Sequence, residues 1–322
     1  MYSEKNYSEQ ILAVNKRKGN VFTHTSDKFN QMLSNPYVGI SPTVVMFVVF
    51  LLFPVAFTFF ISFHNWDAVG PIADFVGLKN YSSLIISDKI FRVSFLNTCV
   101  LMVAGVSTQI TLGILIAQLI KGVKGKTFFR VLFLLPLAMP MVSVGILWNL
   151  VFSPVVGILN ILLQRILLLS NLGKTVWLGD PRTALFCVLI AYSWQYMGLY
   201  VAIFFAALQG VNPLFYEIAD LEGANWLEKF IYVTLPMMKA SFFICFMLCM
   251  VFTARLFPLV YTMTMGGPGN STEILGHTIY KYGFRFFSMG SASAISVILL
   301  VFIILVVIGL VSVLKVEQPK MR

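Results

Sequence analysis

Charged residues are scarce in this chain of 322 residues. Only 11% of them are Asp, Glu, Lys or Arg, whereas 58% are hydrophobic. A soluble domain of ordinary composition carries about a quarter charged residues. This deficit excludes a water-soluble globular protein and indicates an integral membrane protein.

Cysteine and histidine are also few. The chain has four cysteines, all within apolar runs: Cys99, Cys187, Cys245 and Cys249. A disulfide framework is therefore not expected, because such frameworks join cysteines in exposed extracytoplasmic segments. The three histidines lie in separate loops and form no ligand cluster. Cys245 and Cys249 are spaced to share a helix face, but without a nearby histidine they are predicted to pack rather than to bind a metal.

Long apolar runs, in contrast, are abundant. A helix needs about 20 apolar residues to cross the hydrocarbon core of a membrane, and the sequence offers six such runs. They cover about 40–63, 93–120, 131–153, 184–208, 239–262 and 290–314. Continuous runs of this length do not fit the alternating segments of a β-barrel. We therefore predict an all-α membrane protein whose six-helix domain, 38–315, lies between the tails 1–37 and 316–322.

The distribution of basic residues predicts the orientation. If the N-terminus is inside, 14 of the 23 Lys and Arg residues lie in inside segments and eight lie in outside loops. This bias predicts that both termini are cytoplasmic. It also accounts for the net charge of +10 without a nucleic-acid partner. The tail 1–37 has no apolar core of a signal peptide and is predicted to remain as a cytoplasmic tail.

The polar stretch 212–236 separates the fourth and fifth runs. Pro213 suits the first turn of a new helix, and acidic residues follow near that start, where a helix dipole favours negative charge. Gly223 can end this helix in a left-handed conformation. Trp226 and Phe230 then recur at helical spacing. The stretch predicts a short helix, a glycine turn and a second amphipathic helix that could dock into a groove on a soluble partner.

The spacing within this stretch resembles the EAA loop of ABC importer permeases. The matching residues are Glu217, Ala219, Asp220, Glu222, Gly223, Ala224, Val233, Leu235 and Pro236. Ile218 stands where the family usually has Ala, and Glu222 where it usually has Asp. The resemblance implies that this loop is a cytoplasmic coupling helix inserted in a cleft of an ATP-hydrolysing subunit.

Other strings extend the resemblance from about residue 41 to 300. They are FVGLxNY at 75–81, Leu135-Pro136 followed by Trp148, Phe152, Gly157 and Asn160, and Gly266-Gly267-Pro268 after Tyr261. The pattern is similar to sugar-type permeases, in particular the first subunit of the maltose or glycerol-phosphate type. Pro258 departs from it, since an acidic residue is common at that position.

The resemblance implies a complete import machine around this chain. It implies a second homologous permease, two ATPase subunits that bind ATP and Mg²⁺, and an extracytoplasmic solute-binding protein. This chain would be a non-catalytic, multi-pass subunit in a bacterial cytoplasmic (inner) membrane, with no cofactor of its own. The expected cargo is a carbohydrate, either a neutral or an acidic oligosaccharide.

Polar and aromatic residues within the spans suggest a substrate pathway. The candidates are Trp148, Asn149, Tyr192, Trp194, Gln195, Tyr196, Arg255 and Tyr261. Aromatic faces with hydrogen-bonding groups suit a sugar, although ordinary aromatic packing explains them equally well. Arg255 is the only charge well inside an apolar run. It either lines a polar cavity or extends to water at the membrane surface.

Two other functional classes compete with this interpretation. A secondary transporter or channel would need no ATPase, but the chain lacks the paired intramembrane carboxylates of a proton relay. A membrane-embedded enzyme would need a nucleophile–base pair or a metal set, and none is found. The segment KGVKGKT at 121–127 lacks the first glycine and the preceding strand of a phosphate-binding loop. Its basic residues are predicted to anchor the chain near anionic lipid.

Overall fold

The computed structural model describes residues 36–72, 74–165 and 175–314. These residues form helices joined by turns, with one isolated β-bridge and no strand among them. The chain divides into two parts, one up to Thr58 and one from Phe59 onwards. The described residues leave out nearly all of the predicted tails 1–37 and 316–322. They also leave out residues 166–174, which follow α8.

The first part is a nearly continuous apolar helix. It consists of α2 (Pro36–Phe47), the π-helical turn η1 (Val48–Leu52) and the start of α3 (Phe53–Ile61). Pro54 lies in the first turn of α3, where a missing N–H is tolerated. The run Tyr37–Ile61 is 25 residues long and apolar enough to cross a membrane. It corresponds to the first predicted span, 40–63.

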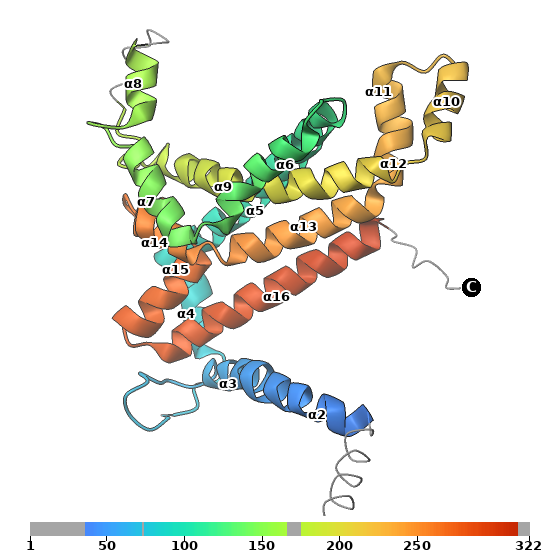
Figure 1. Ribbon diagram of the computed structural model, residues 1–322. Coiled ribbons are helices and arrows are strands. Elements are labelled where there is room, and N and C mark those ends of the chain that lie inside the picture. Colours follow the sequence, from blue (N-terminus) through green and yellow to red (C-terminus); the bar gives the residue numbers. More distant parts are fainter. Residues whose placement is uncertain (1–35, 73, 166–174, 315–322) are drawn as a thin grey trace, which may run out of the picture. The chain divides into compact units, whose positions relative to one another are not determined.

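The second part is built around three long helices. In chain order its elements are α4 (Lys79–Ile86), α5 (Lys89–Lys121), α6 (Lys126–Leu134), η2 (Leu135–Ala138), α7 (Met141–Val151), α8 (Ile158–Arg165), α9 (Ala184–Gln209), α10 (Pro213–Leu221), α11 (Trp226–Glu228), η4 (Lys229–Thr234), α12 (Leu235–Met237), α13 (Lys239–Ala254), α14 (Phe257–Met263), α15 (Leu275–Tyr280), η5 (Lys281–Arg285) and α16 (Met289–Leu314). Helix α5 packs along α9 and α13, and α16 lies beside α13 (Figure 1). Helices α5, α9 and α16 are each long and apolar enough to span a membrane.

The third predicted span, 131–153, is not one continuous helix. The segments Lys126–Ala138 and Met141–Val151 meet at a 100° bend. Pro140 has an extended backbone at this bend and cannot donate an N–H into a helical ladder. The free carbonyl of Met139 is satisfied by the side-chain amide of Gln195, 3.0 Å away. The third predicted span is therefore interrupted at Pro140 and consists of two helical segments.

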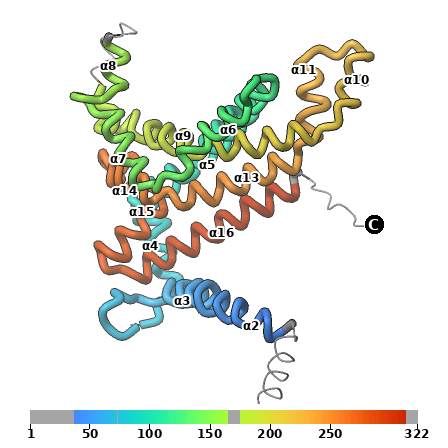
Figure 2. The backbone as a smooth tube through the Cα atoms, in the orientation of Figure 1, coloured from blue at the N-terminus to red at the C-terminus, as the bar shows by residue number. Residues whose placement is uncertain are grey.

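The fifth predicted span, 239–262, is also interrupted. Helix α13 ends at Ala254, and α14 begins after a break at Arg255. At its other end, α13 meets the segment Trp226–Met237 at an angle of 72°. The bend can be followed along the tube in Figure 2. The described residues thus contain four candidate spans, or six if each bent pair crosses once. The count of six remains a prediction.

The core of the second part lies between α5, α9 and α13. The buried rings of Tyr192, Tyr200 and Phe204 fill this space. Helix α6 approaches α9 at Gly198, where an added Cβ would lie only 2.0 Å from the carbonyl oxygen of Phe133. Any larger side chain would push α6 away, so this contact requires glycine.

Candidate functional site

The stretch 212–236 forms a helical hairpin, which we call the 212–236 hairpin. Its first arm is α10, which begins because Asn212 Oδ1 accepts the N–H of Leu214 at 3.0 Å and Pro213 occupies the first turn. The arm ends at Gly223, whose φ of +77° lies in the left-handed region. The predicted helix, glycine turn and second helix are all present.

The second arm begins with a capping box that the sequence interpretation missed. Asn225 Oδ1 accepts the N–H of Glu228 at 3.0 Å, and Glu228 accepts the N–H of Asn225 at 2.7 Å. The signal was present as Asn-x-x-Glu, a known helix start. The arm continues through the π-helical η4, where the rings of Trp226 and Phe230 stack with centroids 5.8 Å apart.

Two contacts join the arms of the hairpin. Lys229 forms an ion pair with Asp220. The hydroxyls of Tyr216 and Thr234 lie 2.9 Å apart, and Thr234 is buried. These contacts hold the two arms as one unit, so the hairpin can move as a rigid body.

A groove of about 510 Å³ lies between the arms. Its lining includes five residues of the predicted motif, Ala219, Glu222, Gly223, Ala224 and Val233, together with Glu228 and Lys229. Tyr232 of the lining is 76% accessible, and Leu221 at the end of α10 is 89% accessible. Exposed apolar surface beside a groove lined by charged side chains is typical of an interaction site.

The remaining residues of the predicted motif have different positions. Glu217 is exposed on α10, and Asp220 is paired with Lys229. Leu235 and Pro236 lie in α12, where the second arm meets α13. The end of the motif therefore coincides with the 72° bend that connects the hairpin to α13.

A second candidate site is a cavity of about 660 Å³ between α5, α6, η2, α7 and α9. Trp148 and Trp194 line it and meet edge to face with ring centroids 5.8 Å apart. The indole N–H of Trp148 is buried and has no hydrogen-bond partner among the described residues. Thr108 and Ser193 supply hydroxyls 3.3 Å apart on the same lining. Most of the other lining side chains are apolar. Aromatic faces with a few hydroxyls are suited to a sugar.

Three other predicted pathway residues are held in helix packing. Asn149 donates to the carbonyl of Thr262 at 2.8 Å and thereby ties α7 to α14. Tyr192 is fully buried, and its hydroxyl lies 3.3 Å from Cys249 Sγ. Gln195 is buried, and its amide binds the carbonyl at the break in the third span. Their observed contacts are with protein groups.

Tyr196 and Arg255 are close to each other near the end of α13. The ring of Tyr196 stacks on Phe252, with centroids 4.5 Å apart. Arg255 caps α13, its side chain is exposed, and its charge acts on the Tyr196 hydroxyl. Arg255 therefore lies at the break between α13 and α14, within the fifth predicted span. Tyr261 belongs to a separate ring cluster with His277 and Tyr280.

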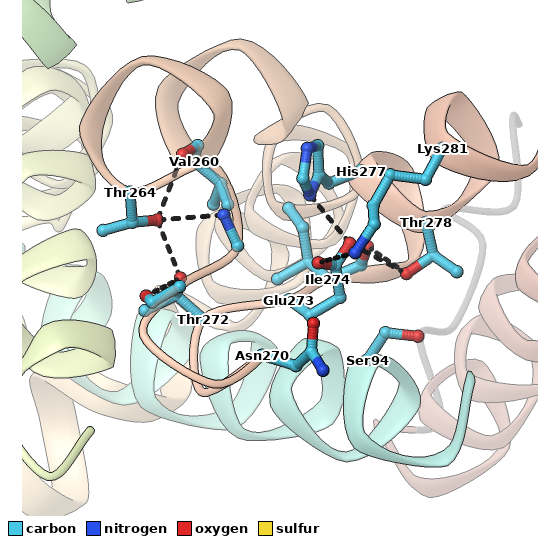
Figure 3. A network of polar contacts seen from close by, with 12 residues as sticks. Ser94, Val260, Thr264, Asn270, Thr272, Glu273, Ile274, His277, Thr278 and Lys281 are labelled. Carbon is cyan, nitrogen blue, oxygen red and sulfur yellow. Dashed lines mark hydrogen bonds and ion pairs between the residues drawn. The ribbon is translucent and has the colours of Figure 1, made fainter. Parts of the chain in front are cut away.

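A buried ionic network beyond α14 was not anticipated from the sequence. Glu273 is fully buried, and Lys281 Nζ lies 3.0 Å from its Oε2. His277 Nδ1 lies 2.7 Å from its Oε1, but the geometry is not that of a hydrogen bond. Figure 3 shows both basic side chains directed at its carboxylate. Thr278 Oγ1 also donates to this carboxylate, at 3.2 Å. The Asn97 amide of α5 anchors the same loop by donating to the Glu273 carbonyl at 2.9 Å. The spacing Glu-x3-His-x3-Lys was the available signal.

This network affects the acidity of Glu273, which lies outside the candidate spans. Burial alone would raise the pKa of Glu273, but its interactions with His277 and Lys281 outweigh burial and hold the pKa below the ordinary value. The carboxylate is therefore charged and compensated at neutral pH. Its role is to fix the loop between α14 and α15.

Comparison with known proteins identifies the family. Residues 109–319 match the family described as binding-protein-dependent transport system inner membrane component. The chain belongs to this family. It is a sugar-type ABC transporter permease by its relatives, among them the multiple sugar-binding transport system permease protein MsmF of Streptococcus mutans. The two are 32% identical over 86% of this chain and 92% of MsmF.

Solved structures share the permease fold. The crystal structure of a bacterial ABC transporter involved in the import of the acidic polysaccharide alginate matches 90% of this permease and 99% of that chain, with a TM-score of 0.75 at 19% identity. A bacterial alginate ABC transporter in complex with an alginate pentasaccharide-bound periplasmic protein matches 88% of this permease and 94% of that chain, with a TM-score of 0.73 at 19% identity. At this identity the likeness concerns the fold alone.

Proposed function

We propose that this permease moves a carbohydrate inward across a bacterial cytoplasmic membrane, driven by ATP hydrolysis in partner subunits. The observation that carries the proposal is the 212–236 hairpin, which presents a groove with exposed apolar and acidic side chains. A surface of this kind in a membrane protein needs a soluble partner to cover it. An ATPase subunit is the partner that the family supplies.

The geometry suits the transmission of movement. The ion pair and hydroxyl contact between the arms stiffen the hairpin, and α12 connects it directly to α13. When ATP binding draws two ATPase subunits together, a docked hairpin would follow as a unit and tilt α13. Glu217, Glu222 and their neighbours would thus transmit force, and the chain itself would have no catalytic role.

The cavity beside α7 and α9 supports a carbohydrate substrate. Trp148 and Trp194 offer apolar ring faces to the CH faces of a sugar, while Thr108 and Ser193 offer hydroxyls to its rim. The names of MsmF and of the alginate transporters agree with a saccharide. Arg255, exposed beside Tyr196, would favour an acidic oligosaccharide over a neutral one.

The proposed assembly contains a second homologous permease, two ATPase subunits that carry ATP and Mg²⁺, and an extracytoplasmic solute-binding protein. Support for the last comes from the alginate transporter, whose structure includes a sugar-loaded periplasmic protein. In the orientation that the distribution of basic residues predicts, both termini and the 212–236 hairpin would face the cytoplasm.

The test is reconstitution of the whole complex in proteoliposomes. We expect labelled oligosaccharide uptake that requires ATP inside and the binding protein outside. The permease alone should neither hydrolyse ATP nor transport. Uptake by the permease alone, driven by an ion gradient, would contradict the proposal and favour a secondary transporter.

A further inference from the structure

The turn between α5 and α6 carries uncompensated positive charge. Its four basic residues are Lys121, Lys124, Lys126 and Arg130, and no acidic residue occurs in the sequence between Asp88 and Asp180. None of the four takes part in an ion pair within the described part of the chain. Arg130 and Lys126 instead lie over the same ring, that of Phe205, at 4.8 and 6.0 Å from its centroid.

One of these cations lines a small cavity against the 212–236 hairpin. The cavity, of about 190 Å³, is lined by Gln118 and Lys121 of α5 and by Tyr216, Trp226, Lys229, Phe230 and Thr234 of the hairpin. Lys121 Nζ lies 5.2 Å from the centroid of the Tyr216 ring. Two basic side chains and two hydroxyl-bearing side chains therefore line one space, together with aromatic rings.

The cavity has the size and charge for a phosphate diester. A water molecule occupies about 30 Å³ in the liquid, so the space holds about six waters. That is room for a phosphate group and part of its ester substituents. Lys229 is already paired with Asp220, which leaves Lys121 as the uncompensated cation. A singly charged anion would neutralise it.

The surroundings favour a lipid as the source of that phosphate. Trp226 is exposed, stacks on Phe230 and lines the cavity with it, and Leu227 and Ile231 are also exposed on the same arm. Trp at the level where a span ends is typical of the membrane interface. Clustered basic residues next to a span attract anionic phospholipids.

We propose that this cavity binds the phosphate of an anionic phospholipid and that the lipid braces the end of α5 against the 212–236 hairpin. Lipid binding in this cavity does not depend on the proposed transport cycle. Only its consequence, that anionic lipid strengthens the coupling between ATP hydrolysis and transport, rests on the proposed function.

The experiment uses the whole transporter complex in nanodiscs of phosphatidylcholine with a rising fraction of phosphatidylglycerol. Native mass spectrometry measures the phosphatidylglycerol retained. Lys121→Gln should weaken retention about fivefold, the equivalent of about 1 kcal/mol per basic residue near the surface. Lys124→Gln, with the same charge change in the same turn but outside the cavity, should weaken it less than twofold. Lys121→Arg keeps the positive charge and should retain phosphatidylglycerol as the wild type does.

Several outcomes would overturn the proposal. Equal loss in Lys121→Gln and Lys124→Gln would show only diffuse attraction. Displacement of the lipid by inorganic phosphate alone, without a preference for phosphatidylglycerol, would show a soluble-anion site. Absence of bound lipid in the wild-type complex, with Lys121 shielded by the ATPase subunit from amine-reactive reagents, would show a protein contact. Failure of transport with lipid retention intact would contradict the proposed function and leave the lipid site standing.

Discussion

Lys229 and Asp220 form an ion pair between the two arms of the 212–236 hairpin, across the turn at Gly223. The pair is partly exposed, so its contribution to stability is small, about 1 kcal/mol or less. Its effect is geometric, because it fixes the angle between α10 and the arm that continues into α13. The glycine turn and the bend at α12 make this hairpin the part of the permease through which movement would pass.

The glycine turn gives the first prediction. Gly223→Pro should abolish transport while leaving the chain inserted and folded. Proline fixes φ near −65°, which is incompatible with the observed +77°, and it removes the N–H that donates to the Asp220 carbonyl at 3.0 Å. Labelled-sugar uptake and membrane yield measure the two effects. Gly223→Asn is the control, because Asn tolerates a left-handed backbone, and it should keep most uptake. Wild-type uptake in Gly223→Pro would argue against the coupling role.

The two tryptophans of the cavity give the second prediction. Trp148→Ala and Trp194→Ala should each raise the KM for sugar uptake about tenfold or more, since a stacking ring face is lost. Trp194→Phe should show a smaller change because it keeps a ring. Leu150→Ala, an exposed position on the same helix as Trp148, is the matched control. If neither tryptophan variant alters KM or the preference among sugars, the cavity is not on the substrate pathway.

The ionic network of Figure 3 gives the third prediction. Glu273→Gln should destabilise the permease by about 3 kcal/mol, since it leaves the buried side of Lys281 without its carboxylate. The folded pKa of Glu273 is lowered, so its stabilising contribution is present above the ordinary value of 4.5 and is lost as pH falls through the folded pKa. Thermal unfolding of the purified complex at several pH values tests both points. Glu222→Gln changes an exposed side chain, so its free energy of unfolding should lie within about 0.5 kcal/mol of the wild-type value. A Glu273→Gln variant that unfolds like wild type at neutral pH would contradict the assignment.

The close contact of α6 with α9 gives the fourth prediction. Gly198→Val should lower the unfolding temperature strongly or prevent folding, because an added Cβ would overlap the Phe133 carbonyl and overpacking costs about 1–3 kcal/mol or more. Gly309→Ala, where nothing lies within 4 Å, should be tolerated. Equal thermal stability of the two variants would mean that α6 does not pack on α9 as described.

Much of the helical order could be predicted from the sequence, because apolar run length and helix-capping residues are local signals. The hairpin is the best example, since Pro213, Gly223 and the amphipathic spacing after it determine its shape without distant contacts. The breaks in the third and fifth predicted spans were harder to predict. At the break before Pro140, the Met139 carbonyl is satisfied by Gln195 of another helix, and that contact is invisible in local sequence.

The candidate pathway shows the same limit. Aromatic and amide residues in the fourth span looked equivalent in the sequence, yet Trp194 lines a cavity while Tyr192 is enclosed by α13. The sequence does not single out Glu273, because His277 and Lys281 become its partners only when α15 folds. Helical phase alone does not show which face of α9 meets a neighbour.

Cross-linking between the 212–236 hairpin and an ATPase subunit tests the central claim most directly. Ala219→Cys places a thiol in the groove between the arms, whereas the native cysteines Cys187, Cys245 and Cys249 are buried. Cys99 is only partly buried, so the background for this variant is Cys99→Ser. In the assembled transporter, we expect a short bifunctional thiol reagent to join the new cysteine to a cysteine in the ATPase subunit, with a yield that changes on ATP binding. Arg285→Cys, at the exposed end of η5, should give no such product. No cross-link from Ala219→Cys, or its labelling by a reagent that reaches only the outer face, would contradict the account.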